Sequence, residues 1–181
     1  MRQLRVASLA VLALLVAASS ADAQRGQRRL WELGTDAGLS FDLAVPTGGA
    51  KTTNMNFPVP SFRAGIYLND EWSLEPSLMY NYAKAEGTPA LSAYVLGFSG
   101  LYHFDTNRSK RQLYLRPFLV LTGASFGGNS ASDTGLGVGV GLKWPKLGGR
   151  IAWRGEANVH RMMDAETTSL GLFWGLSYFT R

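Results

Sequence analysis

The chain has 181 residues, a length that suits a single domain. It contains no cysteine, which excludes disulfides and thiolate metal sites. The formal net charge is +5, but part of the basic excess lies near the N-terminus, at Arg2, Arg5, Arg25, Arg28 and Arg29, and much of the remainder alternates with acids. We therefore expect no nucleic-acid partner.

The N-terminus has the pattern of an export signal. Arg2 and Arg5 precede an apolar run at 6–18, and Ala21-Asp22-Ala23 matches the A-x-A pattern of a cleavage site. The alternative is a membrane anchor, which needs about 20 apolar residues, and this run is shorter. We predict a signal peptide at 1–23, a short basic lead at 24–30 and one domain at 31–181.

From residue 31 onward, apolar and polar residues alternate with a period of two, which is typical of β-strands. Turn-forming residues separate the segments, and the longest such stretch, 46–60, is predicted as a loop. Pro76 and Pro117 lie within segments and predict bulges there. The eight expected strands cover residues 31–43, 61–68, 72–84, 91–104, 112–126, 135–144, 149–162 and 169–178.

The sixth segment, GLGVGVGLKW, has the clearest pair of faces. One face carries Leu136, Val138, Val140, Leu142 and Trp144, and the other carries Gly135, Gly137, Gly139, Gly141 and Lys143. Glycine weakens a strand unless another group approaches it closely. We expect these glycines to accommodate long charged side chains from other strands, among them Arg116 and Arg154.

Side-chain volume predicts which face points outward. Leu and aromatic residues dominate the apolar positions, and together they exceed what the interior of an eight-stranded barrel holds. The alternate positions are rich in Gly, Ser and Ala with a few charged residues, and these fit inside. The sequence therefore predicts an all-β fold, an eight-stranded antiparallel up-and-down transmembrane β-barrel whose apolar face meets lipid.

The aromatic residues support this orientation. If the N-terminus lies on the periplasmic side, odd strands begin there and even strands end there. One interfacial girdle is then predicted at Trp31, Trp72, Tyr102, Phe104, Trp144, Trp153 and Tyr178, and an opposite ring at Phe41, Tyr80, Tyr82 and Tyr94. Two such rings are typical of membrane barrels.

The pattern as a whole resembles the small eight-stranded outer-membrane barrels of Gram-negative bacteria, of the OmpA transmembrane-domain and OmpX type. The last segment, SLGLFWGLSYFTR, is similar to their C-terminal sorting signal, although Thr180 and Arg181 follow Phe179. The resemblance implies an outer-membrane location and contact with outer-membrane lipid and lipopolysaccharide. It also implies recognition by the barrel assembly machinery, and we expect a monomer.

The inward positions carry charges of both signs, which in a narrow interior must pair. The predicted lumen network comprises Glu32, Asp36, Arg63, Glu75, Arg116, Lys143, Arg150, Arg154 and Glu156; Asp42 shares this face. Glu75 and Arg116 are the predicted central pair. We expect a salt-bridge plug that fills the lumen and supports envelope integrity, and the alternative is a narrow gated pore.

Two other functions remain open. Some eight-stranded barrels modify lipid A, but His160-Arg161-Met162-Met163 lacks the His-x-Ser-Asn pattern of lipid A deacylases, and His103 lies near the periplasmic end. We therefore predict no catalytic, cofactor-binding or metal-binding residues, and no enzyme activity. A surface adhesin or receptor would use the predicted outer loop at 45–59, which contains Lys51, Met55 and Phe57.

Overall fold

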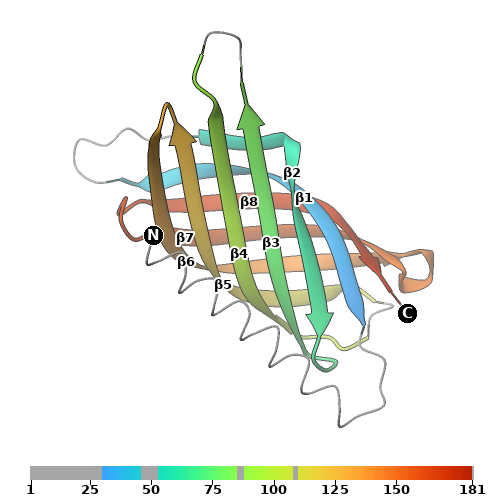
Figure 1. Cartoon of the computed structure of the whole chain (residues 1–181). Coiled ribbons are helices and arrows are strands. Elements are labelled where there is room, and N and C mark those ends of the chain that lie inside the picture. Colours follow the sequence, from blue (N-terminus) through green and yellow to red (C-terminus); the bar gives the residue numbers. More distant parts are fainter. Residues whose placement is uncertain (1–29, 46–52, 85–87, 108–109, 181) are drawn as a thin grey trace.

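The computed structural model describes residues 30–45, 53–84, 88–107 and 110–180, which form a closed barrel of eight antiparallel strands (Figure 1). The predicted signal peptide and nearly all of the basic lead lie outside these residues. Within the described residues, no helix is long and apolar enough to cross a membrane. The strands are β1 (Trp31–Ala44), β2 (Thr53–Tyr67), β3 (Trp72–Ala83), β4 (Leu91–His103), β5 (Gln112–Phe126), β6 (Asn129–Lys146), β7 (Ile151–Met162) and β8 (Thr168–Phe179).

Strand order follows chain order, and β8 closes the sheet by pairing with β1. The period-two pattern predicted the fold class and topology correctly, but two strands begin earlier than predicted. β6 begins at Asn129 and not at residue 135, because its first residues pair with the end of β5. β2 begins at Thr53, so the second half of the predicted 46–60 loop is strand. Prolines and asparagines there favour a loop locally, but pairing of Thr53–Asn56 with β1 extends the strand.

The bulges predicted at Pro76 and Pro117 do not form. The register runs without a shift through Pro76 opposite Phe98 and through Pro117 opposite Val138. A missing N–H affects only one edge of a strand, so the ladder is interrupted on the other side without a slip. The register shifts lie instead in β1, between Asp36 and Gly38 and between Asp42 and Ala44.

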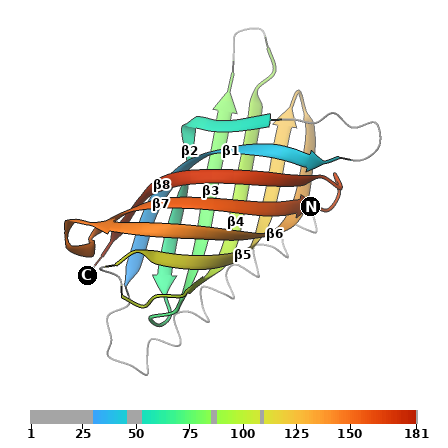
Figure 2. The ribbon, with the colours of Figure 1, turned by 180° about the vertical axis from the view of Figure 1, so that it is seen from behind.

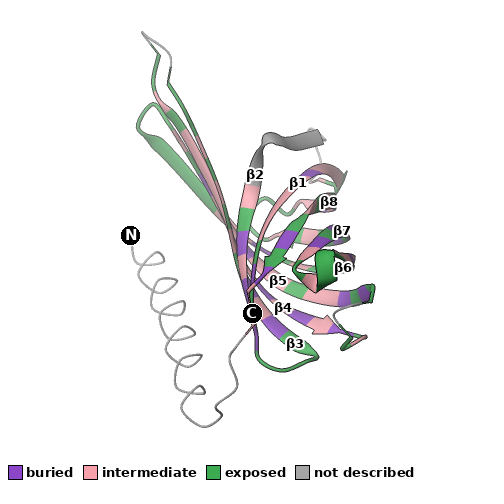
Figure 3. Ribbon diagram, turned by 90° about the vertical axis from the view of Figure 1, so that its right-hand side faces the viewer, coloured by how far each residue is buried: buried purple, intermediate pink, exposed green. Residues whose placement is uncertain are grey.

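The two faces of the wall are oriented as side-chain volume predicts. Burial alternates along the strands (Figure 3). The outward positions Leu136, Val138 and Val140 are about half exposed, whereas the inward Lys143, in the same strand, is 1% exposed. The exterior is therefore apolar and the interior is charged, which is the reverse of the arrangement in a water-soluble barrel. Only lipid solvates such an exterior favourably.

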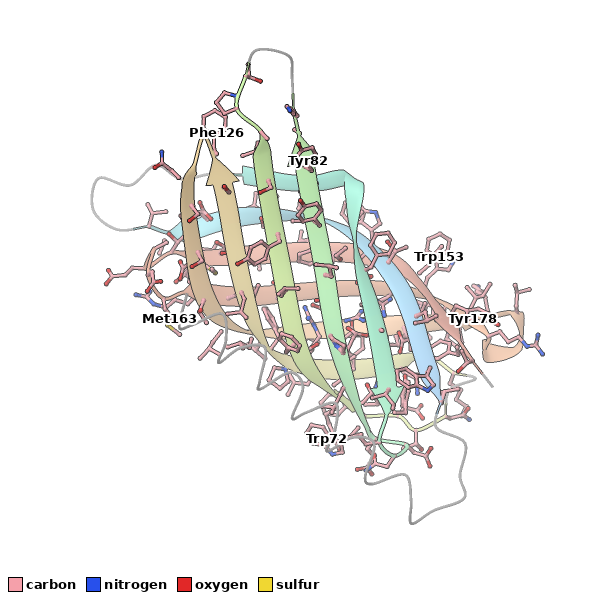
Figure 4. The ribbon with its side chains drawn as sticks, viewed as in Figure 1. Trp72, Tyr82, Phe126, Trp153, Met163 and Tyr178 are labelled. Carbon is pink, nitrogen blue, oxygen red and sulfur yellow. The ribbon has the colours of Figure 1, made fainter. Side chains whose placement is uncertain are left out.

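Aromatic side chains mark the two ends of the apolar exterior. Trp31, Trp72, Trp153 and Tyr178 are exposed, and the rings of Trp72 and Tyr102 contact each other at a centroid distance of 5.1 Å. Trp144 lies opposite Trp153 in the register. Figure 4 places Trp72, Trp153 and Tyr178 toward one end of the barrel and Tyr82 and Phe126 toward the other.

Asp133 of β6 fixes the connection between β7 and β8. This connection lies at the end of the barrel opposite the start of β1 and the end of β8, which we call the outer end in keeping with the predicted orientation. Its carboxylate accepts backbone N–H bonds from Thr134 (2.6 Å), Asp164 (2.9 Å) and Ala165 (3.0 Å). Slight burial raises the pKa of the Asp133 carboxyl, but these N–H donors outweigh it and hold the pKa below its usual value. The clamp is therefore fully formed at neutral pH.

We expect this clamp to open on acidification. Because the folded-state pKa is depressed, its contribution to stability exists above the unfolded-state pKa and disappears as pH falls through the folded-state pKa. The protection factors of the Asp164 and Ala165 amides, which compare each exchange rate with the intrinsic rate at the same pH, should fall at acid pH in the wild type. In Asp133→Asn they should be low at neutral pH as well, and equal protection of both proteins at neutral pH would contradict this role.

Candidate functional site: the polar lumen network

The inner half of the lumen is closed by a continuous network of buried charges. Four carboxylates and four bases take part, contributed by six strands of the wall: Glu32, Asp36, Glu75 and Glu156, with Arg63, Arg116, Lys143 and Arg154. The formal charges of this set cancel. Each carboxylate has a basic partner within ion-pair distance, as burial requires.

Arg63 of β2 is the most connected base. Its Nε donates to Asp36 at 2.7 Å, and its Nη1 donates to Glu32 at 2.8 Å and to Glu75 at 3.1 Å. Its Nη2 donates to Ser177 Oγ and to the Leu176 carbonyl. The guanidinium lies over Gly34, where a Cβ would overlap its atoms. One planar fork therefore joins β1, β2, β3 and β8.

A second centre joins the opposite wall. Arg154 of β7 donates through Nη1 to both carboxylate oxygens of Glu75 at 2.8 Å and through Nη2 to Glu156 at 2.7 Å. Its Nε donates to the hydroxyl of Tyr114 at 2.5 Å, and that hydroxyl donates to Glu156 at 2.8 Å. Glu75 thus links the Arg63 centre to the Arg154 centre.

Lys143 lies at the inner end in an aromatic cage. Its Nζ donates to Glu32 at 2.5 Å and to Tyr67 at 3.2 Å. The same atom lies 5.4 to 5.9 Å from the ring centroids of Tyr67, Tyr114 and Phe179. Ion pairing and cation–π contacts together compensate the ammonium for lost hydration.

The predicted lumen residues take these positions with one exception. Arg150 is exposed and lies in the tight turn after Leu147–Gly149, because β7 begins only at Ile151. The predicted direct pair of Glu75 and Arg116 is also absent. Glu75 contacts Arg63 and Arg154, whereas Arg116 contacts Glu156. Glu156 is connected to Glu75 only through Arg154.

Sequence reasoning missed the tyrosines and Asn158. Tyr67 and Tyr114 are 3% and 0% exposed, and their hydroxyls bond to Glu32 and Glu156. Asn158 donates from Nδ2 to Glu156 at 3.1 Å. Each of these side chains points into the lumen, at the alternate positions where the glycines also lie. A tyrosine or asparagine at such an inward position was the signal that the sequence offered.

The glycines of β6 accommodate different groups from those predicted. A Cβ at Gly141 would overlap the Tyr114 ring, one at Gly139 would lie 2.9 Å from Glu156, and one at Gly135 would lie 2.6 Å from Met162. At Gly137 the neighbours are Phe118 and His160. The expectation of close approach is correct, but aromatic rings and Glu156 make it, and neither Arg116 nor Arg154 is among the nearest atoms.

One buried pair has the appearance of a catalytic dyad. Ser73 Oγ lies 3.0 Å from His103 Nε2, and both residues are almost fully buried. His103 Nδ1 has no hydrogen-bond partner among the described residues, so no acid orients the ring as in a nucleophile–base–acid arrangement. The described residues also contain no group of three side chains suited to a metal ion.

Arg116 is the most accessible base of the network, and its loss should be tolerated. Among the described residues its guanidinium donates hydrogen bonds only to Glu156, which retains Arg154, Tyr114 and Asn158 as donors, and it lies over the Phe118 ring at 4.4 Å. We expect Arg116→Ala to lower the free energy of unfolding by about 1–3 kcal/mol, measured by urea titration in vesicles. The exposed Arg111→Ala serves as a control, with a change within about 0.5 kcal/mol. Unfolding of the variant during purification would contradict the redundancy of donors at Glu156.

Solved structures share this architecture. The chain is similar to Neisserial surface protein A, with a TM-score of 0.58 and 23% identity over 82% of this chain and 96% of that one. It is also similar to Ail, the attachment invasion locus protein of Yersinia pestis, crystallised with the heparin analogue sucrose octasulfate. That match has a TM-score of 0.57 and 12% identity over 85% of this chain and 100% of Ail. No protein-family model and no curated protein sequence matches the chain.

Fold and surface chemistry agree. The barrel is closed, its interior is charged and paired, and its exterior is apolar between two aromatic levels. A closed barrel pairs most of its backbone N–H and C=O groups between neighbouring strands, as a lipid environment requires. The chain has the fold of the small eight-stranded outer-membrane β-barrels, and its apolar exterior is suited to a lipid bilayer.

Proposed function

We propose that the protein is a non-conducting, non-catalytic barrel that supports the outer membrane and presents its outer hairpins for interaction. The observation that carries this proposal is the neutral, fully paired network across the inner half of the lumen. Arg63, Glu75 and Arg154 are each at most 4% exposed. An ion would have to separate these pairs to pass, and separation of buried charges is costly.

Electrical recording tests the closed lumen. The purified chain, folded in planar lipid bilayers, should give no unitary currents over the voltage range in which the membrane itself is stable. Regular unitary currents from the wild type would favour a gated pore instead. A heat-modifiable gel mobility in the same preparation would establish that the silent protein is folded.

The environment of His103 supports the absence of catalysis. The Ser73–His103 pair is sealed within the wall near Leu101 and Tyr114, which are 0% exposed. No route for a lipid A substrate reaches it, because the charge network lies between it and the outer end. The lipid A mass profile of cells overproducing the protein should equal that of cells without it, and a new lipid A species would contradict the proposal.

The interaction role rests on the outer hairpins. Pairing of β5 with β6 continues without a shift to Phe126 opposite Asn129, and this hairpin and the β3–β4 hairpin project from the barrel (Figure 3). Ail, which shares the fold, carries an attachment name and was crystallised with a heparin analogue. Removal of residues 125–130 should reduce attachment to host cells or to immobilised heparin, while the gel mobility of the folded barrel stays unchanged.

A further inference from the structure

The wall of the barrel is incomplete between β2 and β3 in its outer half. The two strands pair from Tyr67 opposite Ser73 to Phe62 opposite Leu78, and within the described residues the pairing ends there. On its other side, β3 remains paired with β4 as far as Ala83 opposite Leu91. The segment Met79–Ala83 therefore has a strand neighbour on one edge only.

The register explains why β2 leaves its neighbour. Leu68 N donates to Trp72 O, so even-numbered residues of β2 direct their backbone polar groups toward β3. Continued upward, the same register would place Pro60 opposite Tyr80 and Pro58 opposite Tyr82. Proline has no N–H to donate, so at both positions that would extend this ladder one of the two hydrogen bonds of the pair cannot form.

β2 pairs with β1 instead. After a shift of register, Thr53–Asn56 lie opposite Phe41–Gly38. In Figures 1 and 2 the outer part of β2 follows β1 sideways, while β3 and β4 continue straight outward. We call the resulting interruption, bounded by Phe62 and Leu78 below and by Tyr80 and Tyr82 along β3, the β2–β3 seam.

At the seam, backbone groups of β3 lack a neighbouring strand to bond to among the described residues. The N–H and C=O groups of Tyr80 and Tyr82 point toward the missing neighbour, and in a membrane such groups need a hydrogen-bonding partner. The Tyr80 and Tyr82 side chains are 56% and 60% exposed, as expected for tyrosines at the level of lipid headgroups. At this level water and lipid headgroups both offer polar atoms, so the head of an amphiphile can take the place of water at this edge.

Behind the seam, the lumen carries an apolar band that is partly exposed. Above Glu75, the inward positions of β3 to β7 include Met79, Val95, Phe118, Val120 and Met162, together with glycines 97, 135 and 137; the polar Ser77, Asn81, Thr122 and His160 share this face. Of the five apolar side chains only Val120 is buried, at 8% exposed, and the others are half-buried, in contrast to the sealed inner network. We call this part of the lumen the outer chamber, and beside Met79, Val95 and Val120 it offers mainly van der Waals contact.

We propose that the β2–β3 seam is a lateral entry through which a single-chain amphiphile from the outer leaflet places its acyl chain in the outer chamber. The chain contacts Met79, Val95 and Val120, and the polar head bonds to the edge of β3 at Tyr80 and Tyr82. The chamber reaches down only to the charge network, roughly 13 Å along β3 from Met79 to Glu75, so the site takes an acyl chain of limited length. This inference uses the membrane location of the barrel and does not depend on whether the plug conducts.

The seam itself is tested with paired cysteines, since the chain has none of its own. Pro60→Cys with Tyr80→Cys spans the seam, and Phe62→Cys with Leu78→Cys spans the last paired position below it. A short bifunctional thiol reagent should link the 62/78 pair readily and the 60/80 pair at least tenfold more slowly. Equal rates would mean that the wall is closed and would overturn the proposal.

The occupant is tested with a diazirine-bearing medium-chain fatty acid in phosphatidylcholine vesicles that contain the folded chain. After irradiation, mass spectrometry should find the label on inward residues Met79, Val95 or Val120 as well as on lipid-facing residues. Val95→Lys, which places a charge in the half-buried chamber, should reduce inward labelling at least tenfold. The matched Val95→Met should preserve it.

Two results would contradict the acyl site. Labelling confined to outward residues such as Leu78 and Leu96 would mean that the probe stays in the bilayer. Inward labelling that is equal in Val95→Lys and Val95→Met would mean that the probe does not occupy the chamber beside Val95. Gel mobility of each variant, heated and unheated, confirms that it is folded, so neither result is attributable to misfolding.

Discussion

Replacement of Arg63 by alanine is expected to lower the free energy of unfolding by about 3–5 kcal/mol, a larger loss than that of any other base in the network. Arg63 bonds to Glu32, Asp36 and Glu75 and is 4% exposed. Its removal takes a hydrogen-bond donor from the buried Glu32 and Glu75 and from the partly buried Asp36. Glu32 keeps Lys143 and Glu75 keeps Arg154, but Asp36 has no other basic partner among the described residues.

Urea titration of the vesicle-bound protein, followed by gel mobility, measures this loss. Arg161→Ala is the matched control, because Arg161 is exposed and its described side-chain bond is a long one, 3.4 Å, to Thr168. The double variant Arg63→Met with Glu75→Gln should recover part of the stability, since it removes a charge of each sign and leaves fewer uncompensated groups. An unfolding midpoint for Arg63→Ala equal to that of the control would mean that the network contributes nothing to folding.

Gly141→Leu is expected to prevent assembly of the barrel. A Cβ at this position would overlap the ring of Tyr114, which is 0% exposed and hydrogen-bonded to Arg154 and Glu156. The ring is held in place by these two bonds, and its displacement would break the Arg154 centre. Overpacking costs typically 1–3 kcal/mol even when a core relaxes, and loss of the network adds to that.

Gly139→Leu should also block folding, because its Cβ would lie 2.9 Å from Glu156 and 3.1 Å from Asn158. The control is Val140→Leu, between the two glycines on the opposite face, where the side chain is 50% exposed to lipid. It should fold like the wild type. Refolding yield and heat-modifiable mobility measure all three variants, and a well-folded Gly141→Leu would refute the close packing of Tyr114 against β6.

The fold was predictable because the alternation of apolar and polar residues and the volumes of their side chains can be read within each strand. A one-residue slip of β6 would move Leu136 and Val140 into the lumen and the glycines into lipid. The same alternation assigned Glu32, Arg63, Lys143 and Arg154 to the interior without knowledge of their partners. It failed for Arg150, since a turn with positive φ at Leu147, Gly148 and Gly149 delays the start of β7 beyond that residue.

Pairing was not predictable in this way, because it depends on how far each strand is shifted along its neighbour. Glu75 and Arg116 come from strands that are not neighbours, and the stagger of the barrel brings Glu75 to Arg63 and Arg154 instead. The two tyrosines show the same limit. Their phase indicated an inward side chain, but only the assembled wall reveals that their hydroxyls connect acids and bases.

The sequence by itself determined that this chain is a membrane β-barrel, because alternation of side-chain size and polarity leaves one arrangement that fits a narrow interior and a lipid exterior. Only the tertiary structure decided which charges pair and where the wall is interrupted. Both depend on register between strands, which is set by contacts remote in sequence. Pro58 and Pro60 gave a loop-like signal, and their effect on the β2–β3 seam exists only because β1 offers β2 an alternative partner.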